Sequence, residues 1–476
     1  MMIQEDINNS LHEEHARRKK RKRRKKYNEY NAVLNDVDHE TFVALYRHRL
    51  LTVEMLYQLI IEDKRELLLA SYRNRLNKLA VKGYLEGRSV SKVVIGKTEN
   101  LNVPEKAYSL TDKGILVVLD YLDLYDYSFD QEGAFNIEFD KAEDIKVHGQ
   151  LPHHFMTQGI VINTLRAFET KYEGTRFYEF NCGNGKKYSL KWNSNEKERS
   201  IYPDWMFVFS EEESVSQNDS IYIAVEADRK TMNGKQIEQK FIGYLNHVQQ
   251  NEKLYINTPL TVVVAVENRS RKRIKTLIQN VFLTMESAIY ENLVRVYVVS
   301  EEEAGEKIIH SLREGVTFDE NIEDAIKGMA ETVTRSTGYM LKHTLLGYES
   351  QDKHGFLPTP SREMVFGKGY GEEIRFICLE MEKGSVNSQA KAFHFKETLQ
   401  QSDKKAYVLG MYNKKEDLID EMFIDTSRRY NQTVQMGKQV IFSTSIDLKK
   451  GIVYQIEKNQ NNTQIIRQVS LQDVLV

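Results

Sequence analysis

Three acidic residues at the ends of two strand-like runs constrain this sequence most. Asp204 opens the apolar run 205–209, while Glu226 and Asp228 close the run 221–225. Both runs are rich in β-branched and aromatic residues, which predicts buried strands. Residues two apart on a strand point to the same face, so Glu226 and Asp228 are expected to face the same way. If the two strands pair, Asp204 joins them in a carboxylate cluster of the kind that holds Mg²⁺ or Mn²⁺.

The same residues resemble the motif of the PD-(D/E)xK nuclease superfamily, in which a proline-aspartate, a second acid and a lysine bind metal and activate water. At the position of the superfamily's lysine, this sequence has Asp228. The superfamily tolerates a lysine moved to the next helix, where Lys240 stands. The resemblance implies that Asp204, Glu226, Asp228 and Lys240 are catalytic, with the three acids as ligands of Mg²⁺ or Mn²⁺. The residues alone also fit strand-end acids that are solvated separately.

A block of consecutive basic residues near the start of the sequence predicts a polyanionic partner. Residues 1–26 carry a net charge of +6, which leaves −8 for the remainder of a chain whose total is −2. Such a block cannot bury itself, so residues 1–37 are expected to form a disordered arm whose natural partner is a phosphate backbone. A nuclear import signal fits the same block. Its members are Arg17, Arg18, Lys19, Lys20, Arg21, Lys22, Arg23, Arg24, Lys25 and Lys26.

Residues 38–125 have the pattern of three short helices followed by a β-hairpin. Asp38 is the predicted N-cap of the first helix and Thr52 that of the second. In the third helix, predicted over residues 68–82, apolar side chains recur at spacings of four and three. This periodicity turns the polar and basic side chains of that helix to its outer face.

This region resembles a winged helix-turn-helix domain. The phrases at 82–85, after the third helix, and at 108–114, after the hairpin, are typical of that family. The resemblance implies that the third helix enters the major groove of double-stranded DNA and that the wing contacts the backbone or minor groove. The alternative is a module for protein contacts whose charges only solvate one face. The candidate DNA contacts are Arg73, Asn74, Arg75 and Lys78, with Asn74 able to read adenine.

An acidic, irregular stretch at 126–148 predicts a linker to an α/β domain over residues 149–315. The alternation of strands and helices there predicts a central mixed sheet with helices on both faces, which matches the αβββαβ core of the nuclease superfamily. The chain is thus expected to be a multidomain α+β and α/β protein. The predicted elements are a helix after residue 152, polar β segments at 176–180 and 188–192, the two acidic strands, the helix of Lys240, a strand at 260–266, a helix at 271–285 and a strand at 293–299.

Histidine and cysteine usage predicts no zinc site. His153 and His154 point about 100° apart on a helix, so they cannot both ligate one metal in the usual way. Packing and capping roles are expected, with one of the two bordering the acid cluster as the other option. Cys182 and Cys378 are too few for a disulfide framework, which fits a reducing cytoplasm. Because no run of 18 apolar residues occurs, no membrane segment is expected.

The C-terminal part, residues 325–476, predicts a second, diverged copy of the nuclease-like fold. The run 376–383 aligns in character with 222–229, which sets Glu380 and Glu382 against Glu226 and Asp228. The nearest counterpart of Asp204 is Glu363, so we expect an inactive partner that packs on the first copy or on DNA. Chance similarity between α/β domains is the alternative. The other aligned segments are 388–401, 406–413, 415–423 and 438–443.

Residues 38–300 together resemble the replication-relaxation family of plasmids and integrative elements of Gram-positive bacteria. The phrase Glu226 to Arg229 is its most specific part, and Asp228 is the residue expected there in this family. The resemblance implies a bacterial DNA-binding protein that acts in replication or DNA relaxation, with replication or relaxosome proteins or a second copy of itself as further partners. An active Mg²⁺-dependent endonuclease or nickase is the first alternative, and a transcriptional regulator the second.

Overall fold

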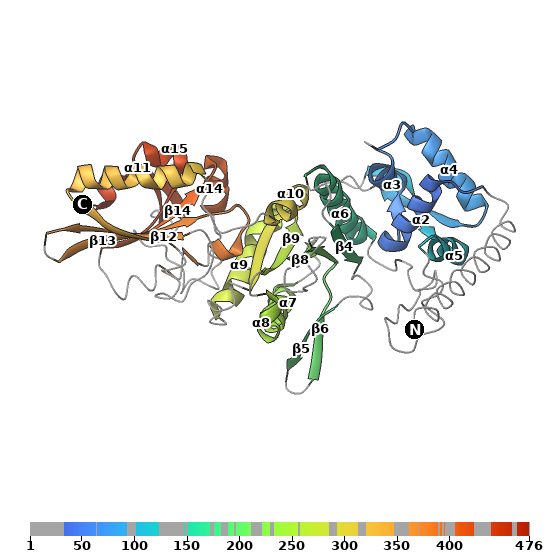
Figure 1. The fold of residues 1–476 in the computed structure, drawn as a ribbon, viewed down its shortest axis with the longest axis horizontal. Coiled ribbons are helices and arrows are strands. Elements are labelled where there is room, and N and C mark those ends of the chain that lie inside the picture. The colour runs from blue at the N-terminus through green and yellow to red at the C-terminus, as the bar shows by residue number, and fades with distance from the viewer. Residues whose placement is uncertain are drawn as a thin grey trace, which may run out of the picture. The chain divides into compact units, whose positions relative to one another are not determined.

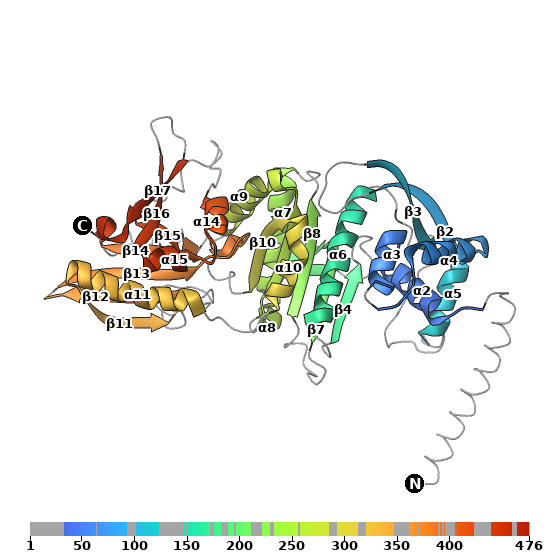
Figure 2. The same ribbon diagram turned by 90° about the horizontal axis from the view of Figure 1, so that it is seen from above.

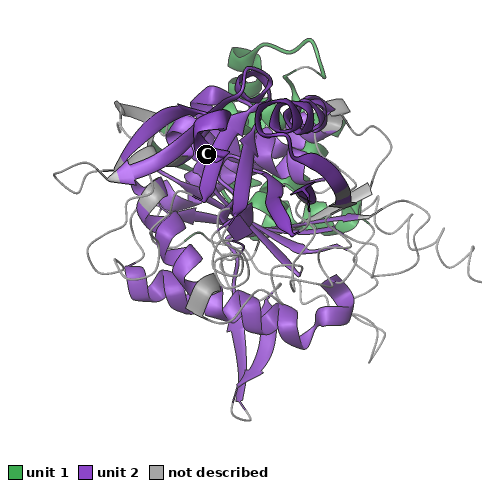
Figure 3. Cartoon of the chain, turned by 90° about the vertical axis from the view of Figure 1, so that its left-hand side faces the viewer, with its two compact units in different colours: residues 1–90, 104–147 green, residues 91–103, 148–476 purple. Residues whose placement is uncertain are grey.

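The protein is described from a computed structural model that forms two compact units, one made of residues 1–90 and 104–147, the other of residues 91–103 and 148–476 (Figure 3). The basic block at 17–26 and nearly all of the predicted linker lie outside the described residues. The structure describes residues 33–475 except 63, 93–100, 123–146, 148–150, 172–175, 182–188, 195–196, 211–220, 229–232, 256–257, 285–292, 313–319, 347–360, 370, 389–390, 393–394, 396–404, 423–438 and 459–463.

The first unit contains the three predicted helices and most of a small sheet. The helices are α2 (Asp36–His48), α3 (Val53–Ile60) and α4 (Leu69–Val81), and α5 (Asp112–Tyr121) follows the sheet. The strands β1 (Leu51–Thr52), β2 (Leu85–Lys92) and β3 (Leu101–Leu110) lie in the order β1-β3-β2. The core is built from side chains that the helical spacing predicts to face inward, among them Phe42, Tyr72, Leu76 and Leu79, all nearly free of solvent contact.

The start of α2 corrects one prediction. Its N-cap is Asn35, whose side chain accepts a hydrogen bond from the Asp38 backbone N–H at 3.0 Å. Asp38 is the third residue of the helix, and its carboxylate accepts from the Asn35 N–H at 2.9 Å, which completes a capping box. The prediction of Asp38 as the cap was wrong because it is the reciprocal member of the box. Thr52, by contrast, caps α3 as predicted and accepts from the Met55 N–H.

The first sheet of the second unit is mixed, as predicted. Its strands are β4 (Arg176–Asn181), β7 (Trp205–Ser210), β8 (Ile221–Asp228), β9 (Leu260–Val266) and β10 (Val294–Ser300), in the order β10-β9-β8-β7-β4. The pairs β4/β7 and β7/β8 are antiparallel, while β8/β9 and β9/β10 are parallel. The parallel strands β8 and β9 are connected through a helix, which is the usual way to join parallel neighbours.

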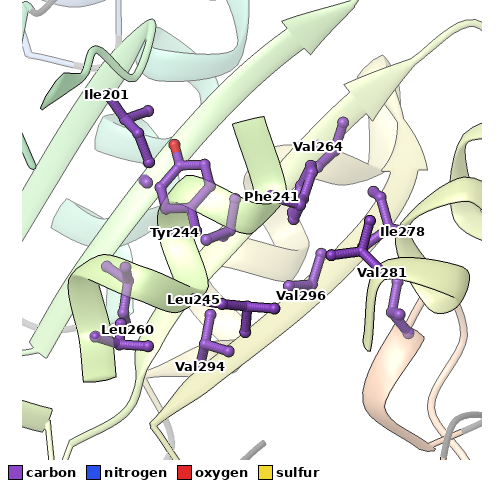
Figure 4. Close-up of a cluster of buried hydrophobic side chains, with 14 of the residues drawn as sticks. Ile201, Phe241, Tyr244, Leu245, Leu260, Val264, Ile278, Val281, Val294 and Val296 are labelled. Atoms are coloured by element: carbon purple, nitrogen blue, oxygen red, sulfur yellow. The ribbon is translucent and has the colours of Figure 1, made fainter. Parts of the chain in front are cut away.

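Helices cover both faces of this sheet (Figures 1 and 2). One face carries α6 (Leu151–Lys171) and α10 (Glu301–Ser311), and the other carries α7 (Gly234–Gln250) and α9 (Asn268–Thr284). Between α7, α9 and the sheet lies a continuous apolar core that includes Phe241, Tyr244, Val264 and Val296 (Figure 4). The short helix α8 (Glu252–Tyr255) adds Tyr255 to it. Burial of these side chains is the main source of stability for this part of the unit.

Only one of the two polar β segments predicted in this region joins the central sheet. The segment at 176–180 becomes the edge strand β4. The second segment becomes β5 (Leu190–Ser194), which pairs with β6 (Lys197–Ile201) as an antiparallel ribbon separate from the central sheet. Figure 1 shows this ribbon projecting away from the sheet beside α7. The ribbon leads directly into the strand β7 that follows Asp204.

The C-terminal part of the second unit holds a seven-stranded sheet whose first five strands have the same order and relative directions as β4-β7-β8-β9-β10. Two further antiparallel strands extend it. In order, the strands are β11 (Met340–Leu346), β12 (Ser361–Lys368), β13 (Glu372–Glu380), β14 (Ala406–Tyr412), β15 (Val440–Thr444), β16 (Ile452–Lys458) and β17 (Gln464–Ser470), and the helices are α11 (Glu320–Thr337), α14 (Lys415–Met422), α15 (Ser445–Lys449) and α16 (Leu471–Leu475).

The residue-by-residue alignment predicted between the two sheets is wrong by one position. Glu226 of β8 faces α7. In β13, Leu379 lies on the corresponding face. It packs in one core with Phe395, which belongs to the helical segment after that strand. Cys378 packs instead in the core under α11. Because faces alternate along a strand, Glu380 lies on the side of Cys378 and not on the side that corresponds to Glu226.

Glu363 does not correspond to Asp204 either. It lies within β12, opposite Ile377, whereas Asp204 precedes its strand. The Glu363 side chain is buried at 1% exposure, with Arg375 as its ion-pair partner at 3.8 Å. The second sheet therefore does not repeat the arrangement of acids found in the first.

The C-terminal part contacts the first sheet along β10. The Val298 N–H donates to the Gly384 carbonyl at 2.8 Å. The Asn387 side chain accepts from the Val296 N–H at 2.8 Å and donates to the Val294 carbonyl at 2.9 Å. These bonds satisfy backbone groups that would be left unpaired at the edge of the five-stranded sheet.

A buried ion pair adds to this contact between the two parts of the second unit. Glu421 of α14 accepts hydrogen bonds from Lys275 and Arg271 of α9, and from the Gly384 N–H at 3.1 Å. Lys275 and Glu421 expose only 6% and 4% of their surface. Buried charges of this kind are tolerated only when each has a partner, so the contact depends on both sides being present.

Candidate functional site

The strands β7 and β8 bring Asp204 beside Glu226. The Asp204 N–H donates to the Val225 carbonyl at 3.1 Å, which continues the antiparallel ladder one residue beyond β7. The carboxylate Oδ2 of Asp204 accepts from the Ala227 N–H at 2.8 Å. Asp204 is thus held against the β8 backbone at the residue between Glu226 and Asp228. The predicted pairing of the two acidic runs is confirmed.

Glu226 is bound by two side chains of α7. Its Oε2 accepts a hydrogen bond from the ammonium of Lys240, and its Oε1 accepts from the hydroxyl of Tyr244. Lys240 and Tyr244 are four residues apart, so they project from the same face of the helix. An N-terminal capping box at Asn233 fixes where α7 begins, and therefore which residues face β8. Glu226 itself is almost fully buried, at 1% exposure.

His153 of α6 completes the cluster. Its Nε2 lies 3.1 Å from Oδ1 of Asp204. The sequence favoured a packing or capping role for this histidine, with a place beside the acids as the other option, and the structure has it beside the acids. No sequence signal connects α6 to Asp204, because some fifty residues separate them and only the packing of α6 across β8 brings them together.

The pKa values of Glu226 and Asp204 are shifted in opposite directions. Burial raises the pKa of Glu226 to about 7, although Lys240 favours the charged form. Burial also acts to raise the pKa of Asp204, but the hydrogen bond from His153 and the charge of Lys240 outweigh it, and the pKa lies below its usual value. Asp204 is therefore the acid that stays charged near neutral pH, while Glu226 titrates there.

The two bases of the cluster have raised pKa values. The hydrogen bond to Asp204 raises the pKa of His153 against the opposing effect of burial. Burial acts to lower the pKa of Lys240, but the charges of Glu226 and Asp204 outweigh it and raise the value. Both bases are thus favoured in their charged forms, so the cluster contains its own cations.

Asp228 lies on the same side of β8 as Glu226, at the end of the strand and opposite Val266 of β9. Its side chain is buried at 1% exposure. Its negative charge contributes to the raised pKa of Lys240. All three predicted acids therefore act on the pKa of the predicted lysine, Lys240.

The donor atoms of this cluster do not fit a metal ion as they stand. Both carboxylate oxygens of Glu226 already accept from Lys240 and Tyr244, and those of Asp204 face Ala227 and His153. An ion would have to displace one of these protein groups, and Lys240 is the cation already in place. Within the described residues, no group of three or more His, Cys, Asp or Glu side chains is arranged to hold a metal.

The predicted DNA-contacting residues of α4 divide into two kinds. Arg73, Asn74 and Lys78 are exposed on its outer face. Arg75 instead donates to Asp38 through Nε at 2.8 Å and through Nη2, and its Nη2 also donates to the Val33 carbonyl. This guanidinium thus ties α4 to α2, a role that outward helical spacing did not predict.

The third helix is also connected to the hairpin that follows it. Oδ1 of Asn77 accepts from Lys106 at 2.7 Å and from the hydroxyl of Tyr108 at 2.9 Å. Both donors belong to β3. These bonds fix α4 relative to the part of β3 that lies in the first unit.

These elements define an α+β protein with several sheets and a buried cluster of acids, lysine and histidine. Residues 42–260 match the sequence model of a family described as replication-relaxation. The match suggests a role in the replication or relaxation of plasmids or mobile elements. Comparison with curated proteins and with solved structures returned no match. No helix among the described residues is long and apolar enough to cross a membrane.

Proposed function

We propose that the protein is a DNA-binding factor of a plasmid or mobile element, acting in replication or DNA relaxation. In this proposal the first unit is a winged helix-turn-helix domain, with α4 as its recognition helix and the β2/β3 hairpin as its wing. The observation that carries the proposal is the exposed face of α4, where Arg73, Asn74 and Lys78 stand free of the core. Arginine and lysine contact phosphates and guanine, and asparagine reads adenine in the major groove.

The nuclease-like fold of the second unit is proposed to hold DNA without cutting it. Its strand order and the meeting of Asp204, Glu226 and Lys240 support descent from the PD-(D/E)xK fold. The internal cations, Lys240 and His153, support a binding role, because they neutralise the acids that a nuclease would offer to a metal. A carboxylate left without a cation would repel the DNA backbone.

The C-terminal part is proposed to be a diverged and inactive copy of the same fold. The shared strand order and directions support duplication. On the face that corresponds to Glu226, the last residues of β13 and its continuation are apolar, with Leu379 and Met381 in the core. The acids of the catalytic motif have no counterparts there. The role of the C-terminal part is then to stabilise the edge strand β10 of the first sheet, to which Gly384 and Asn387 are hydrogen-bonded.

A duplex-binding experiment tests this function. Fluorescence anisotropy with labelled duplex DNA in EDTA should show salt-dependent binding by the full chain. Replacing Arg73 and Lys78 by alanine should weaken binding and lower the salt slope, by about 0.9 for each lost phosphate contact. The matched control replaces Arg335 and Lys327, an exposed pair on α11, and should bind like the parent. No binding by the parent, or equal loss in both double variants, would contradict the proposal.

An active nuclease is the second candidate, and the convergence of Asp204, Glu226 and Lys240 from three elements favours it. In that case metal binding would require Lys240 to leave Glu226. A transcriptional regulator would need only the first unit. Such a role leaves the acid cluster and the seven-stranded sheet without a function.

A further inference from the structure

The ribbon β5/β6 presents a charged surface that neither the cluster nor the winged-helix unit uses. Its two strands pair from Leu190 with Ile201 to Ser194 with Lys197, apart from the central sheet. The exposed side chains among its described residues are all polar, and three are basic against one acidic: Lys191, Asn193, Lys197, Glu198 and Arg199. Lys191 forms an ion pair with Glu198 at 3.0 Å, so Lys197 and Arg199 are the cations that this pair leaves over. The ribbon itself, residues 190–194 and 197–201, exposes polar and charged side chains, which suit a polyanion better than an apolar protein surface.

The ribbon is held rigidly by α7, although an isolated two-stranded hairpin is only marginally stable. Gln250 bonds twice to the Asn193 backbone, accepting from its N–H at 2.7 Å and donating to its carbonyl at 2.8 Å. His247 bonds to the Lys191 carbonyl through Nδ1 at 2.7 Å and to the Tyr255 hydroxyl through Nε2 at 2.9 Å.

A glycine lets the base of the ribbon approach α7 closely. A Cβ on Gly243 would lie 2.8 Å from Cδ1 of Ile201 and 2.9 Å from Cη2 of Trp192. The glycine thus allows both strands to contact the helix that also carries Lys240 and Tyr244. The position of the ribbon is therefore coupled to the helix that holds the cluster.

The chain runs from the ribbon straight into the cluster. Ile201 ends β6 as a buried residue, and Tyr202 follows with 45% of its surface exposed. Pro203 is buried, and Asp204 comes next. An exposed tyrosine ring two residues before Asp204 offers an apolar face and a hydroxyl, which suits contact with a sugar or base.

We propose that the β5/β6 ribbon and Tyr202 form a second contact with double-stranded DNA, with Lys191, Lys197 and Arg199 against phosphates. This rests on the proposed DNA-binding function and extends it to a surface of the second unit. A two-stranded ribbon has the width to enter the major groove, and lysine and arginine supply the counterion release that drives duplex binding. The ribbon would place the duplex next to Asp204.

The test is duplex binding by the full chain with Lys191, Lys197 and Arg199 replaced by alanine. Affinity at low salt should fall by tenfold or more, and the salt slope should decrease by about 2 to 3. The matched control replaces Lys327, Lys450 and Arg335, three exposed cations of the C-terminal part, and should leave both quantities unchanged. An unchanged slope in the ribbon variant, or an equal change in the control, overturns the proposal.

A second variant tests positioning without changing charge. Gln250→Ala removes the two bonds to Asn193 and should lower affinity at least threefold while circular dichroism shows the same fold. Binding equal to that of the parent would count against a rigidly held ribbon and overturn the proposal. A parent that binds no duplex overturns the proposed function as well. A parent that binds while the ribbon variants match it overturns only the role of the ribbon.

Discussion

Replacing Lys240 by methionine should destabilise the protein in a manner that depends on pH. The folded pKa of Glu226 is about 7, above the usual value of 4.5. An acid whose pKa is higher in the folded than in the unfolded protein lowers the free energy of unfolding as pH rises. The loss begins near the pKa of the unfolded state and becomes constant above the pKa of the folded state. With Lys240 in place, this penalty stops growing near neutral pH and amounts to about 3 kcal/mol.

Without the lysine, the penalty should continue to grow. Lys240 lowers the pKa of Glu226 by its charge and its hydrogen bond, so Lys240→Met moves that pKa further above 7. Each additional unit of pKa adds about 1.4 kcal/mol once the pH has passed it. The variant should therefore lose about 1 kcal/mol more, relative to the parent, at about pH 8 than at about pH 6.

Urea unfolding followed by circular dichroism at both pH values measures this difference. Lys235→Met is the matched control, since Lys235 is an exposed lysine on the same helix, and its effect should be small and independent of pH. If Lys240→Met lowers the free energy of unfolding by the same amount at both pH values, Glu226 is not the acid of the cluster that titrates near neutral pH.

Three further substitutions test the packing of each unit by the free energy of unfolding, and a fourth, Arg73→Ala, is paired with one of them for comparison. Gly384→Ala should cost about 2 to 4 kcal/mol, because φ is +79° and a Cβ would lie 2.7 Å from Val299; a loss below about 1 kcal/mol would contradict this. Asn387→Ala leaves two buried backbone groups of β10 unpaired and should cost about 2 kcal/mol or more, whereas a neutral result would mean that this edge is not closed as described. Arg75→Ala removes the ion-pair partner of the buried Asp38 and should lower the free energy of unfolding by about 2 kcal/mol. Arg73→Ala should weaken DNA binding and leave the free energy of unfolding unchanged. Loss of stability in Arg73→Ala but not in Arg75→Ala would be inconsistent with these contacts.

The core of the candidate site was predictable because short-range rules place its members. The spacing of two between Glu226 and Asp228 fixes a shared strand face, and the spacing of four between Lys240 and Tyr244 fixes a shared helix face. The pairing of consecutive strands then brings Asp204 to Glu226. These relations involve neighbours in sequence or consecutive elements.

The features that sequence missed depend on long-range packing. His153 reaches Asp204 because α6 crosses β8, and Arg75 reaches Asp38 because α2 packs against α4. Neither contact has a local pattern. The one-residue error in β13 has a different cause. This strand is buried on both faces, so apolar residues do not alternate with polar ones and hydrophobicity cannot fix which face a residue takes.

Incubation of the full chain with supercoiled plasmid and Mg²⁺ or Mn²⁺, analysed for both binding and nicking, distinguishes a DNA-binding protein from a nuclease. A DNA-binding protein whose acid cluster is neutralised from within should retard the plasmid and leave it supercoiled, with and without EDTA. Asp204→Ala and Glu226→Ala should then give the same absence of product. Nicked plasmid formed by the parent and lost in both variants would contradict a binding-only role and establish the cluster as a metal-dependent nuclease site.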